Sequence, residues 1–340
     1  MLTLCIHEAE TPLAKARIED VAARAGTSPV TVSRALRSPA KVAPETRARI
    51  AEAIAALEYI PNMAASSLAS RRSGIAAMLV PTIGNSVFAE TVRGVSDALA
   101  GTGLQLLIGD YAYSDQGERD LMRALIGRQP EALVVIGVIR DPELRTLLKR
   151  LDVPVVETWD LTDTPVDSVV GFSNPGAGAA IATHFLTRGR RRLAFVGGTD
   201  DRAEARARGF AQAARDEGAA PPHIEHSQGI SIAAGRGALA RILAAAPATD
   251  AVFFATDVLA VGGLLECQSR GIEIPTQLAI AGLGDLEIGR ELTPALTTVQ
   301  IPAYAMGHRA GELALARRAG HNPGPAIVDL GFTIVARQSS

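Results

Sequence analysis

Residues 18–37, with the sequence IEDVAARAGTSPVTVSRALR, decide the fold of the N-terminal part of this chain. Val21, Ala22 and Ala25 recur at helical spacing and therefore predict a short helix with one apolar face. Gly26 then permits a tight turn, because glycine adopts backbone angles that other residues avoid. The stretch predicts two short helices joined by that turn.

The second helix has its own start signal. Ser28 is a good N-cap, and Pro29 suits the first helical position. Val32 and Leu36 lie four residues apart, so we expect both to face the core. A third helix is expected to begin at Pro44 and to bury Ile50, Ile54 and Leu57. Three helices around a glycine-containing turn are the geometry of a DNA major-groove reader.

Four strings in this region point to a known family. They read DVAARAG at 20–26, TVSRAL at 31–36, ETR at 45–47 and LEYIPN at 57–62. Together they closely resemble the headpiece of the LacI/GalR family of bacterial transcription regulators, and the similarity continues through most of the chain. The resemblance implies a helix-turn-helix DNA-binding headpiece over residues 17–61.

The resemblance also implies how DNA is held. The second helix would enter the major groove, with Arg34 as the principal base reader and with Val30 and Thr31 close to base edges. The DNA phosphates would be held mainly by Ser28, Ser33, Arg71 and Arg72. Residues 62–73 would form a hinge helix and linker that fold when two copies pair over DNA, and Leu68 matches the family residue that wedges between bases in the minor groove. The expected DNA-binding residues are Ser28, Val30, Thr31, Ser33, Arg34, Asn62, Ala65, Leu68, Arg71 and Arg72.

Charge is divided unevenly along the 340 residues. The whole chain carries 34 Lys or Arg and 36 Asp or Glu, so net charge alone does not indicate a nucleic-acid partner. Residues 1–72 hold ten basic and seven acidic side chains, whereas the remainder holds 24 and 29. This split fits a DNA-facing N-terminal unit on a mildly acidic body.

Targeting and metal signals are weak. Cys5 and Cys267 have no metal-ligand spacing around them, which favours a reducing compartment. Residues 1–16 lack a basic start followed by an apolar run, so we interpret them as a flexible arm and not as a signal peptide. No apolar run is long enough to cross a bilayer. We therefore expect a cytoplasmic protein with no membrane contact and no cofactor.

After Ser73 the pattern changes to apolar runs that alternate with helical periodicity, which predicts βαβ units and parallel sheets. Strands are expected at 75–80, 104–108, 132–138, 154–157, 193–197, 251–255 and 278–282. Helices are expected near 89–101, 116–127, 142–151, 175–188, 203–217, 233–246, 257–271 and 303–319, with final strands in 326–337.

The resemblance implies that residues 74–340 form an effector-binding and dimerisation domain. Its fold would be α/β, with two doubly wound parallel-sheet subdomains like those of periplasmic binding proteins, joined by three crossing strands. The N-terminal subdomain would take about 74–165 and 303–321. The C-terminal subdomain would take about 166–302 and 322–340.

Ligands of open α/β folds collect at the carboxyl ends of the strands, so we searched the loops that follow strands for binding residues. Arg206 matches the family arginine that holds the effector, and its planar guanidinium suits a carboxylate or a phosphate. Both Arg202 and Arg206 could instead lie on a helix surface. Arg202 is the weaker candidate for ligand contact, because the family match is to Arg206. Trp159 could instead be a core or interface aromatic residue. The expected effector-binding residues are Asn85, Phe88, Trp159, Arg206, Thr256 and Asp285.

The chain departs from the family pattern at several positions. The string Gly282-Leu283-Gly284-Asp285 places glycine where many relatives carry an effector-binding acid, so we expect Asp285 or Glu287 to replace it. Arg17 and Ala43 stand where capping Thr and Ser are common. Each lost cap costs about 1 kcal/mol, which predicts a less stable headpiece.

Strings at 85–90, 170–174, 264–268 and 330–333 resemble the gluconate-utilisation repressors within this family. The resemblance implies a sugar-acid effector, gluconate or its phosphate, with Arg206 at the anionic end. We expect a homodimer that binds a palindromic double-stranded DNA operator and is released by the effector. An activator or a co-repressed regulator would share every residue named above.

No catalytic motif or metal site is expected. Gly282 and Gly284 lack the third glycine of a dinucleotide site, because position 287 is Glu, and His7-Glu8 lacks a second His at position 11. Two other classes of protein remain as alternatives. A sugar-binding transport protein would need a signal peptide and no headpiece, and a sugar-acid enzyme would need an acid–base pair in the cleft.

Overall fold

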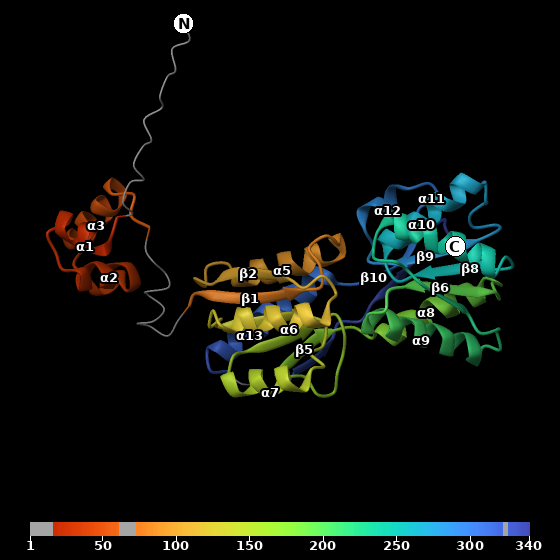
Figure 1. The fold of residues 1–340 in the computed structure, drawn as a ribbon, viewed down its shortest axis with the longest axis horizontal. Helices are drawn as coiled ribbons and strands as arrows, with labels where there is room; N and C mark the ends of the chain where they lie inside the picture. Colours follow the sequence, from red (N-terminus) through yellow and green to blue (C-terminus); the bar gives the residue numbers. More distant parts are fainter. Residues whose placement is uncertain (1–15, 61–72, 322–325) are drawn as a thin grey trace, which may run out of the picture. The chain divides into compact units, whose positions relative to one another are not determined.

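The computed structural model describes residues 16–60, 73–321 and 326–340. The chain divides into two compact units, one ending at Ser73 and the other beginning at Gly74. The first unit is helical (Figure 1). Its elements are α1 (Ile18–Arg24), α2 (Pro29–Arg37), the 3₁₀ turn η1 (Pro39–Lys41) and α3 (Pro44–Ala56).

The core of the first unit follows the expected pattern with one exception. Val21, Val32 and Ile50 are buried, but Leu36 is 40% exposed and Ala35 is buried instead. The prediction that Leu36 faces the core was wrong. Positions three and four residues apart share a helical face, so the sequence spacing alone did not distinguish Ala35 from Leu36.

The three α-helices of this unit differ in the hydrogen bonds that cap their N-termini. In α1 the Asp20 carboxylate accepts a hydrogen bond from the Arg17 backbone N–H at 2.8 Å. In α2 the Ser28 hydroxyl accepts one from the Thr31 backbone N–H at 3.2 Å. The N-cap of α3 is Ala43, which offers no side-chain acceptor. The first turn of α3 is therefore the least well capped in this unit.

We expect Ala43→Ser to stabilise the first unit by about 1 kcal/mol, because the new hydroxyl can accept a hydrogen bond from the first turn of α3. Hydrogen exchange of the α3 amides in the full chain measures this. Ala51→Ser, on the exposed face of the same helix, is the matched control and should be neutral or slightly destabilising. Equal protection in the two variants would contradict the prediction.

The second unit contains two six-stranded sheets. The first sheet has the order β11-β5-β4-β3-β1-β2, and all its strands are parallel. The second has the order β12-β10-β9-β8-β6-β7, and only the β10–β12 pair is antiparallel. The strands are β1 (Ile75–Val80), β2 (Gln105–Asp110), β3 (Ala132–Ile136), β4 (Val155–Thr158), β5 (Ser168–Gly171), β6 (Leu193–Gly197), β7 (His223–His226), β8 (Ala251–Phe254), β9 (Ala279–Leu283), β10 (Thr297–Gln300), β11 (Ala326–Asp329) and β12 (Thr333–Val335).

Helices cover both faces of each sheet (Figure 1). They are η2 (Ser86–Phe88), α5 (Ala89–Leu99), α6 (Asp115–Ile126), α7 (Pro142–Leu151), α8 (Asn174–Thr187), α9 (Asp201–Asp216), α10 (Ile232–Ala245), α11 (Asp257–Arg270), α12 (Glu287–Glu291) and α13 (Ala303–Arg318). None of the helices in the described ranges has the length and apolar character needed to cross a membrane. The expected α/β class, two parallel-sheet subdomains after a helical unit, is confirmed.

Three segments, 172–173, 301–302 and 330–332, connect the two sheets. The subdomain boundaries expected from the sequence need correction. β5 and β11 both pair within the first sheet, so the chain does not leave the first subdomain at 166, and the tail after 322 is shared between the subdomains. β5, β7 and β10 were not expected from the sequence.

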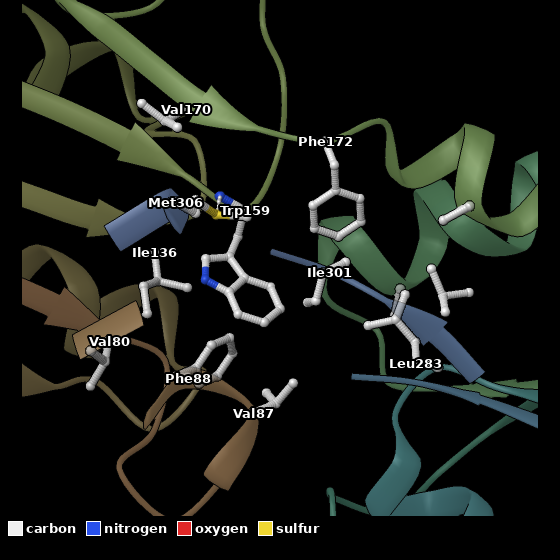
Figure 2. Packing of buried hydrophobic residues seen from close by; sticks show 14 of the residues in the cluster. Val80, Val87, Phe88, Ile136, Trp159, Val170, Phe172, Leu283, Ile301 and Met306 are labelled. Carbon is white, nitrogen blue, oxygen red and sulfur yellow. Dashed lines mark hydrogen bonds between the residues drawn. The ribbon is translucent and has the colours of Figure 1, made fainter. Parts of the chain in front are cut away.

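Aromatic side chains join the subdomains where the chain crosses. Figure 2 shows the Trp159 indole between the rings of Phe88 and Phe172, with Leu283 from the second subdomain facing them. The ring centroids lie 4.8 Å apart for Phe88 and Trp159 and 6.2 Å apart for Trp159 and Phe172. Because residues from both sheets belong to one apolar cluster, the subdomains share a core at this point.

Helices α8 and α9 touch through their backbones at two glycines. A Cβ on Gly178 would lie 2.0 Å from the Arg206 carbonyl oxygen, and a Cβ on Gly209 would lie 2.0 Å from the Pro175 carbonyl oxygen. No other residue fits at either position without separating the helices. This contact therefore fixes where the side chains on α9 lie relative to α8.

We expect Gly178→Ala to lower the free energy of unfolding by at least about 2 kcal/mol, because overpacking forces the helices apart. Urea denaturation of the full chain measures this. Gly237→Ala is the matched control, since that helical position in α10 has only the end of the Arg241 side chain nearby. It should be neutral or stabilise by up to about 1 kcal/mol. Equal stability of the two variants would refute the packing argument.

Candidate ligand site and nucleic-acid interface

A cavity of about 670 Å³ opens between the two subdomains, at the carboxyl ends of strands from both sheets. We call it the outer cavity. From the first subdomain it is lined by the loops after β2, β3 and β4, and from the second by the start of α9 and the loop after β7. Its lining residues include Tyr111, Tyr113, Arg140, Asp160, Asp200 and Arg202.

A smaller pocket of about 20 Å³, the inner pocket, adjoins the outer cavity. Trp159, Arg206 and Thr256 line it, together with apolar side chains from both subdomains. Tyr113 and Arg202 line both spaces and therefore form part of the wall between them. The cleft thus has a polar outer part and a nearly filled inner part.

Arg206, on α9, is 5% exposed and lines the inner pocket. One terminal nitrogen, Nη1, donates to the Asn174 Oδ1 at 2.5 Å, but Nε has no hydrogen-bond partner among the described protein groups. Burial lowers the pKa of Arg206 to about 10, against the opposing attraction of Asp200. The side chain is therefore a buried cation at neutral pH with an unused donor.

Arg202 lies one turn earlier on the same helix and is 8% exposed. Its guanidinium carbon lies 5.4 Å from the centre of the Phe88 ring, and Nε lies 3.6 Å from the Asp200 carboxylate. Burial acts to lower the pKa of Arg202, but Asp200 and the nearby tyrosines outweigh it, so the pKa is raised. Nη1 has no hydrogen-bond partner among the described protein groups.

Two buried asparagines lie behind the lining of the inner pocket and contact residues that line it. The Asn174 Nδ2 donates to the Trp159 carbonyl at 2.9 Å and to the Asp160 carboxylate at 3.0 Å, so Asn174 links Arg206 to the first subdomain. The Asn85 Oδ1 accepts from the Val87 N–H at 3.2 Å, while its Nδ2 has no partner in the described structure.

Three of the unpartnered buried donors in the described structure, those of Arg206, Arg202 and Asn85, belong to residues that line the inner pocket or contact its lining, and two of the three residues carry positive charge. Leaving such groups unpaired costs free energy, and a charged acceptor satisfies them best. The arrangement is therefore suited to bind an anion. Among the described residues, no group of three or more His, Cys, Asp or Glu side chains could hold a metal ion.

The aromatic residues and Thr256 shape the apolar side of the inner pocket. The Trp159 Nε1 donates to the Thr91 hydroxyl at 2.9 Å, so the indole presents only carbon to the pocket. Phe88 packs between Trp159 and the Arg202 guanidinium. Thr256 caps α11 by accepting from the Leu259 N–H at 3.4 Å. Of the expected residues, Trp159, Arg206 and Thr256 line the inner pocket. Phe88 and Asn85 do not line it, but Phe88 contacts Trp159 and Arg202, and Asn85 contacts Val87.

Asp285 lies outside this group, which corrects the sequence expectation. Its carboxylate accepts hydrogen bonds from Arg337 at 2.6 Å, Arg290 at 2.7 Å and Gln300 at 2.7 Å, and it lines neither the outer cavity nor the inner pocket. Glu287 is exposed. The acid replaced by Gly284 therefore has no substitute at these two positions.

The sequence analysis missed Tyr111 and Tyr113, which line the outer cavity. They follow β2 directly, and Ala112 and Tyr113 have φ values of 52° and 55° that turn the chain sharply there. Burial raises the pKa of both phenols. Their place directly after a strand is the sequence signal that points to them, because ligands of open α/β folds collect at strand ends.

The second helix of the N-terminal unit presents a mixed face to solvent. Val30 is 63% exposed and Arg34 is exposed, whereas Thr31 and Ser33 are half-buried. The Ser28 hydroxyl lies 2.9 Å from the Thr31 hydroxyl. The exposed face of α2 is thus available to a DNA groove. The remaining expected DNA contacts, Asn62, Ala65, Leu68, Arg71 and Arg72, lie outside the described residues.

A helix-turn-helix unit attached to a two-subdomain body with a polar cleft defines a ligand-responsive DNA-binding protein. Residues 17–62 match the family model described as bacterial regulatory proteins, lacI family, and residues 182–340 match the periplasmic binding protein-like domain. The HTH-type transcriptional regulator GntR of Pseudomonas aeruginosa is 39% identical over 326 residues, with 95% of each chain covered. The chain belongs to the LacI family and is a DNA-binding transcriptional regulator, not an enzyme.

Solved structures agree with this assignment. A LacI-family regulator from Silicibacter pomeroyi is 31% identical, with a TM-score of 0.88 over 95% of this chain and 99% of that chain. The lac repressor dimer bound to operator is 19% identical, with a TM-score of 0.81 over 96% and 99% of the two chains, and supports the fold alone. The family assignment made from the sequence is confirmed.

We expect Asp285→Asn to lower the free energy of unfolding by about 2 kcal/mol, because the buried carboxylate accepts charged hydrogen bonds from Arg337 and Arg290. Asp163→Asn, at an exposed loop position, is the matched control and should change stability by less than about 0.5 kcal/mol. Urea denaturation measures both. Unchanged stability in Asp285→Asn would show that the network is not structural.

Proposed function

We propose that this protein is a repressor that binds a palindromic operator as a homodimer and is released by a sugar acid, gluconate or its phosphate. The pair of buried arginines with unused donors in the inter-subdomain cleft carries the proposal. A guanidinium pairs with a carboxylate or a phosphate through parallel hydrogen bonds, and a hydroxylated carbon chain suits the surrounding tyrosine, carboxylate and aromatic groups.

On the DNA side, the exposed face of α2 supports major-groove binding. Arg34 has the donor geometry that reads guanine, and Val30 can contact a thymine methyl group. Leu68, outside the described residues, stays a prediction as the minor-groove wedge. Phosphate contacts from Ser28 and the arginines near the hinge would make the affinity fall as salt rises.

The connection between ligand and DNA runs through the subdomain junction. Arg206 belongs to the second subdomain, and Asn174 ties it to the carbonyl of Trp159 in the first. A ligand that engages both sides of the cleft favours one arrangement of the subdomains over another. The DNA affinity then changes by the free energy with which the ligand distinguishes those arrangements.

Family likeness supports the remaining parts of the proposal. The relatives named GntR and the dimeric lac repressor bound to operator favour a homodimer on a two-half-site operator. Such a regulator acts in the cytoplasm, where its DNA is. Whether the ligand releases the protein or strengthens binding is an outcome of the test below.

We expect gluconate to weaken operator binding by the wild-type protein by about tenfold or more, the range of ordinary allosteric coupling. Fluorescence anisotropy with a palindrome from the gene's own upstream region measures this. Arg206→Ala should bind the same DNA but lose the response to gluconate. Arg208→Ala is the matched control, since its side chain lies on α9 but is 69% exposed and should respond as wild type does.

The outcomes separate the parts of the proposal. Tight, sequence-specific binding that is indifferent to gluconate and its phosphate would keep the DNA function and remove the ligand. If gluconate or its phosphate strengthened operator binding, the protein would be a co-repressed regulator and not one released by its effector. Arg34→Ala should reduce the preference for operator over other DNA by about 1–3 kcal/mol, which would support base reading by Arg34 in the major groove. Weaker operator binding by Leu68→Ala would support the minor-groove wedge.

A further inference from the structure

The outer cavity and the inner pocket have opposite charge. Among the described residues that line the outer cavity, the carboxylates are Asp115, Glu118, Asp160, Asp200 and Asp201, and the guanidiniums are Arg140 and Arg202. The inner pocket is lined by Arg202 and Arg206, each with one unpartnered nitrogen, and by one acid, Asp200, which also lines the outer cavity. A ligand that spans both spaces therefore meets cations at one end and carboxylates at the other.

Each guanidinium that lines the outer cavity has a carboxylate beside it. Arg140 contacts the Asp201 carboxylate and lies 3.7 Å from the Asp160 carboxylate. Within the described part of the chain, Arg202 forms one salt bridge, with Asp200 at 3.6 Å, and its guanidinium lies over the Phe88 ring. No guanidinium of the described lining is left to neutralise a second anion in this space.

Two acids of the outer cavity lie close together at the start of α6. Asp115 occupies the first turn of that helix, and Glu118 lies three residues later on the same face. Burial and the negative charges of Asp115 and Asp141 raise the pKa of Glu118. Carboxylates accept hydrogen bonds and donate none when ionised, so they suit the hydroxyl groups of a polyol and repel an anion.

The two inner arginines can act on one end of a ligand. Arg202 and Arg206 are four residues apart on α9, so their side chains lie on the same face of the helix. Both residues line the inner pocket, and each has one buried nitrogen without a hydrogen-bond partner. One carboxylate can therefore accept hydrogen bonds from both, with its carbon chain leading past Arg202 into the outer cavity.

We propose that the cleft selects a hydroxylated acid with a single negative end, held by Arg202 and Arg206, and that the carboxylates of the outer cavity reject a second charge at the far end. This rests on the proposed function and deepens it, because it favours the unphosphorylated acid. Arg202 is then a specificity-determining residue, and Asp115 and Glu118 set the selection against dianions.

Isothermal titration calorimetry on the full-length protein with four probes tests the proposal. The probes are gluconate, 6-phosphogluconate, the dicarboxylate glucarate and the neutral polyol glucitol. Gluconate should bind. Glucitol should bind at least about tenfold more weakly because it leaves the buried arginines unpaired. The two dianions should also bind at least about tenfold more weakly because like charges meet in the outer cavity.

Neutral variants of the outer cavity locate the selection. The quantity to compare is the affinity gap, the ratio of the dissociation constants for 6-phosphogluconate and gluconate. Glu118→Gln and Asp115→Asn, made singly and together, should lower this ratio, by about tenfold in the double variant. Glu204→Gln is the matched control, because Glu204 lies on the outside of α9 with its side chain 48% exposed, and its gap should equal that of wild type. Arg202→Gln should weaken gluconate while leaving glucitol unchanged.

The results distinguish sugar-acid binding itself from selection against a second negative charge. If no acid binds, the proposed sugar-acid function fails and the selectivity fails with it. If 6-phosphogluconate or glucarate binds wild type as tightly as gluconate does, the single-charge inference is overturned and the sugar-acid function stands. A gap that persists in the double variant would also overturn the role of Asp115 and Glu118.

Discussion

The backbone contact between α8 and α9 is the constraint on which the ligand site depends. Gly178 and Gly209 leave no space for a Cβ, so the two helices cross at direct contact. That crossing carries Arg206 to the start of α8, where Asn174 accepts its hydrogen bond. Since α8 begins just after the chain passes from the first sheet to the second, the same contact also joins the site to the subdomain junction.

The balance of charge in the cleft changes from the inner pocket to the outer cavity. Buried guanidiniums lie at the inner end, and carboxylates surround the outer space. Burial strengthens electrostatic interactions, because little water is present to screen them. A ligand with one charged end and one hydroxylated end would therefore bind in a single orientation. It would also touch both subdomains, which a regulator needs if binding is to change how they are arranged.

Much of this could be predicted from local sequence patterns. The helix-turn-helix follows from residues 18–37, and the alternation of apolar runs and helices predicted the α/β body. Arg206 and Phe88 were found because they follow strands and match a family pattern. Tyr111 and Tyr113 were not predicted because their place in the cavity depends on the sharp backbone turn after β2, and Leu36 was placed inward because helical spacing does not separate it from Ala35.

The sequence by itself determined the elements, the family and the edge of the sheets at which a ligand binds, because these depend on residues close together along the chain. Only the tertiary structure decided which side-chain groups keep a free hydrogen-bonding position for a ligand. Asp285 follows a strand as a binding residue would, but Arg337, 52 positions away, occupies its carboxylate. Arg206 shares its guanidinium with Asn174, 32 positions away, and keeps one donor unused. Such pairings arise from contacts between distant segments, which local patterns do not record.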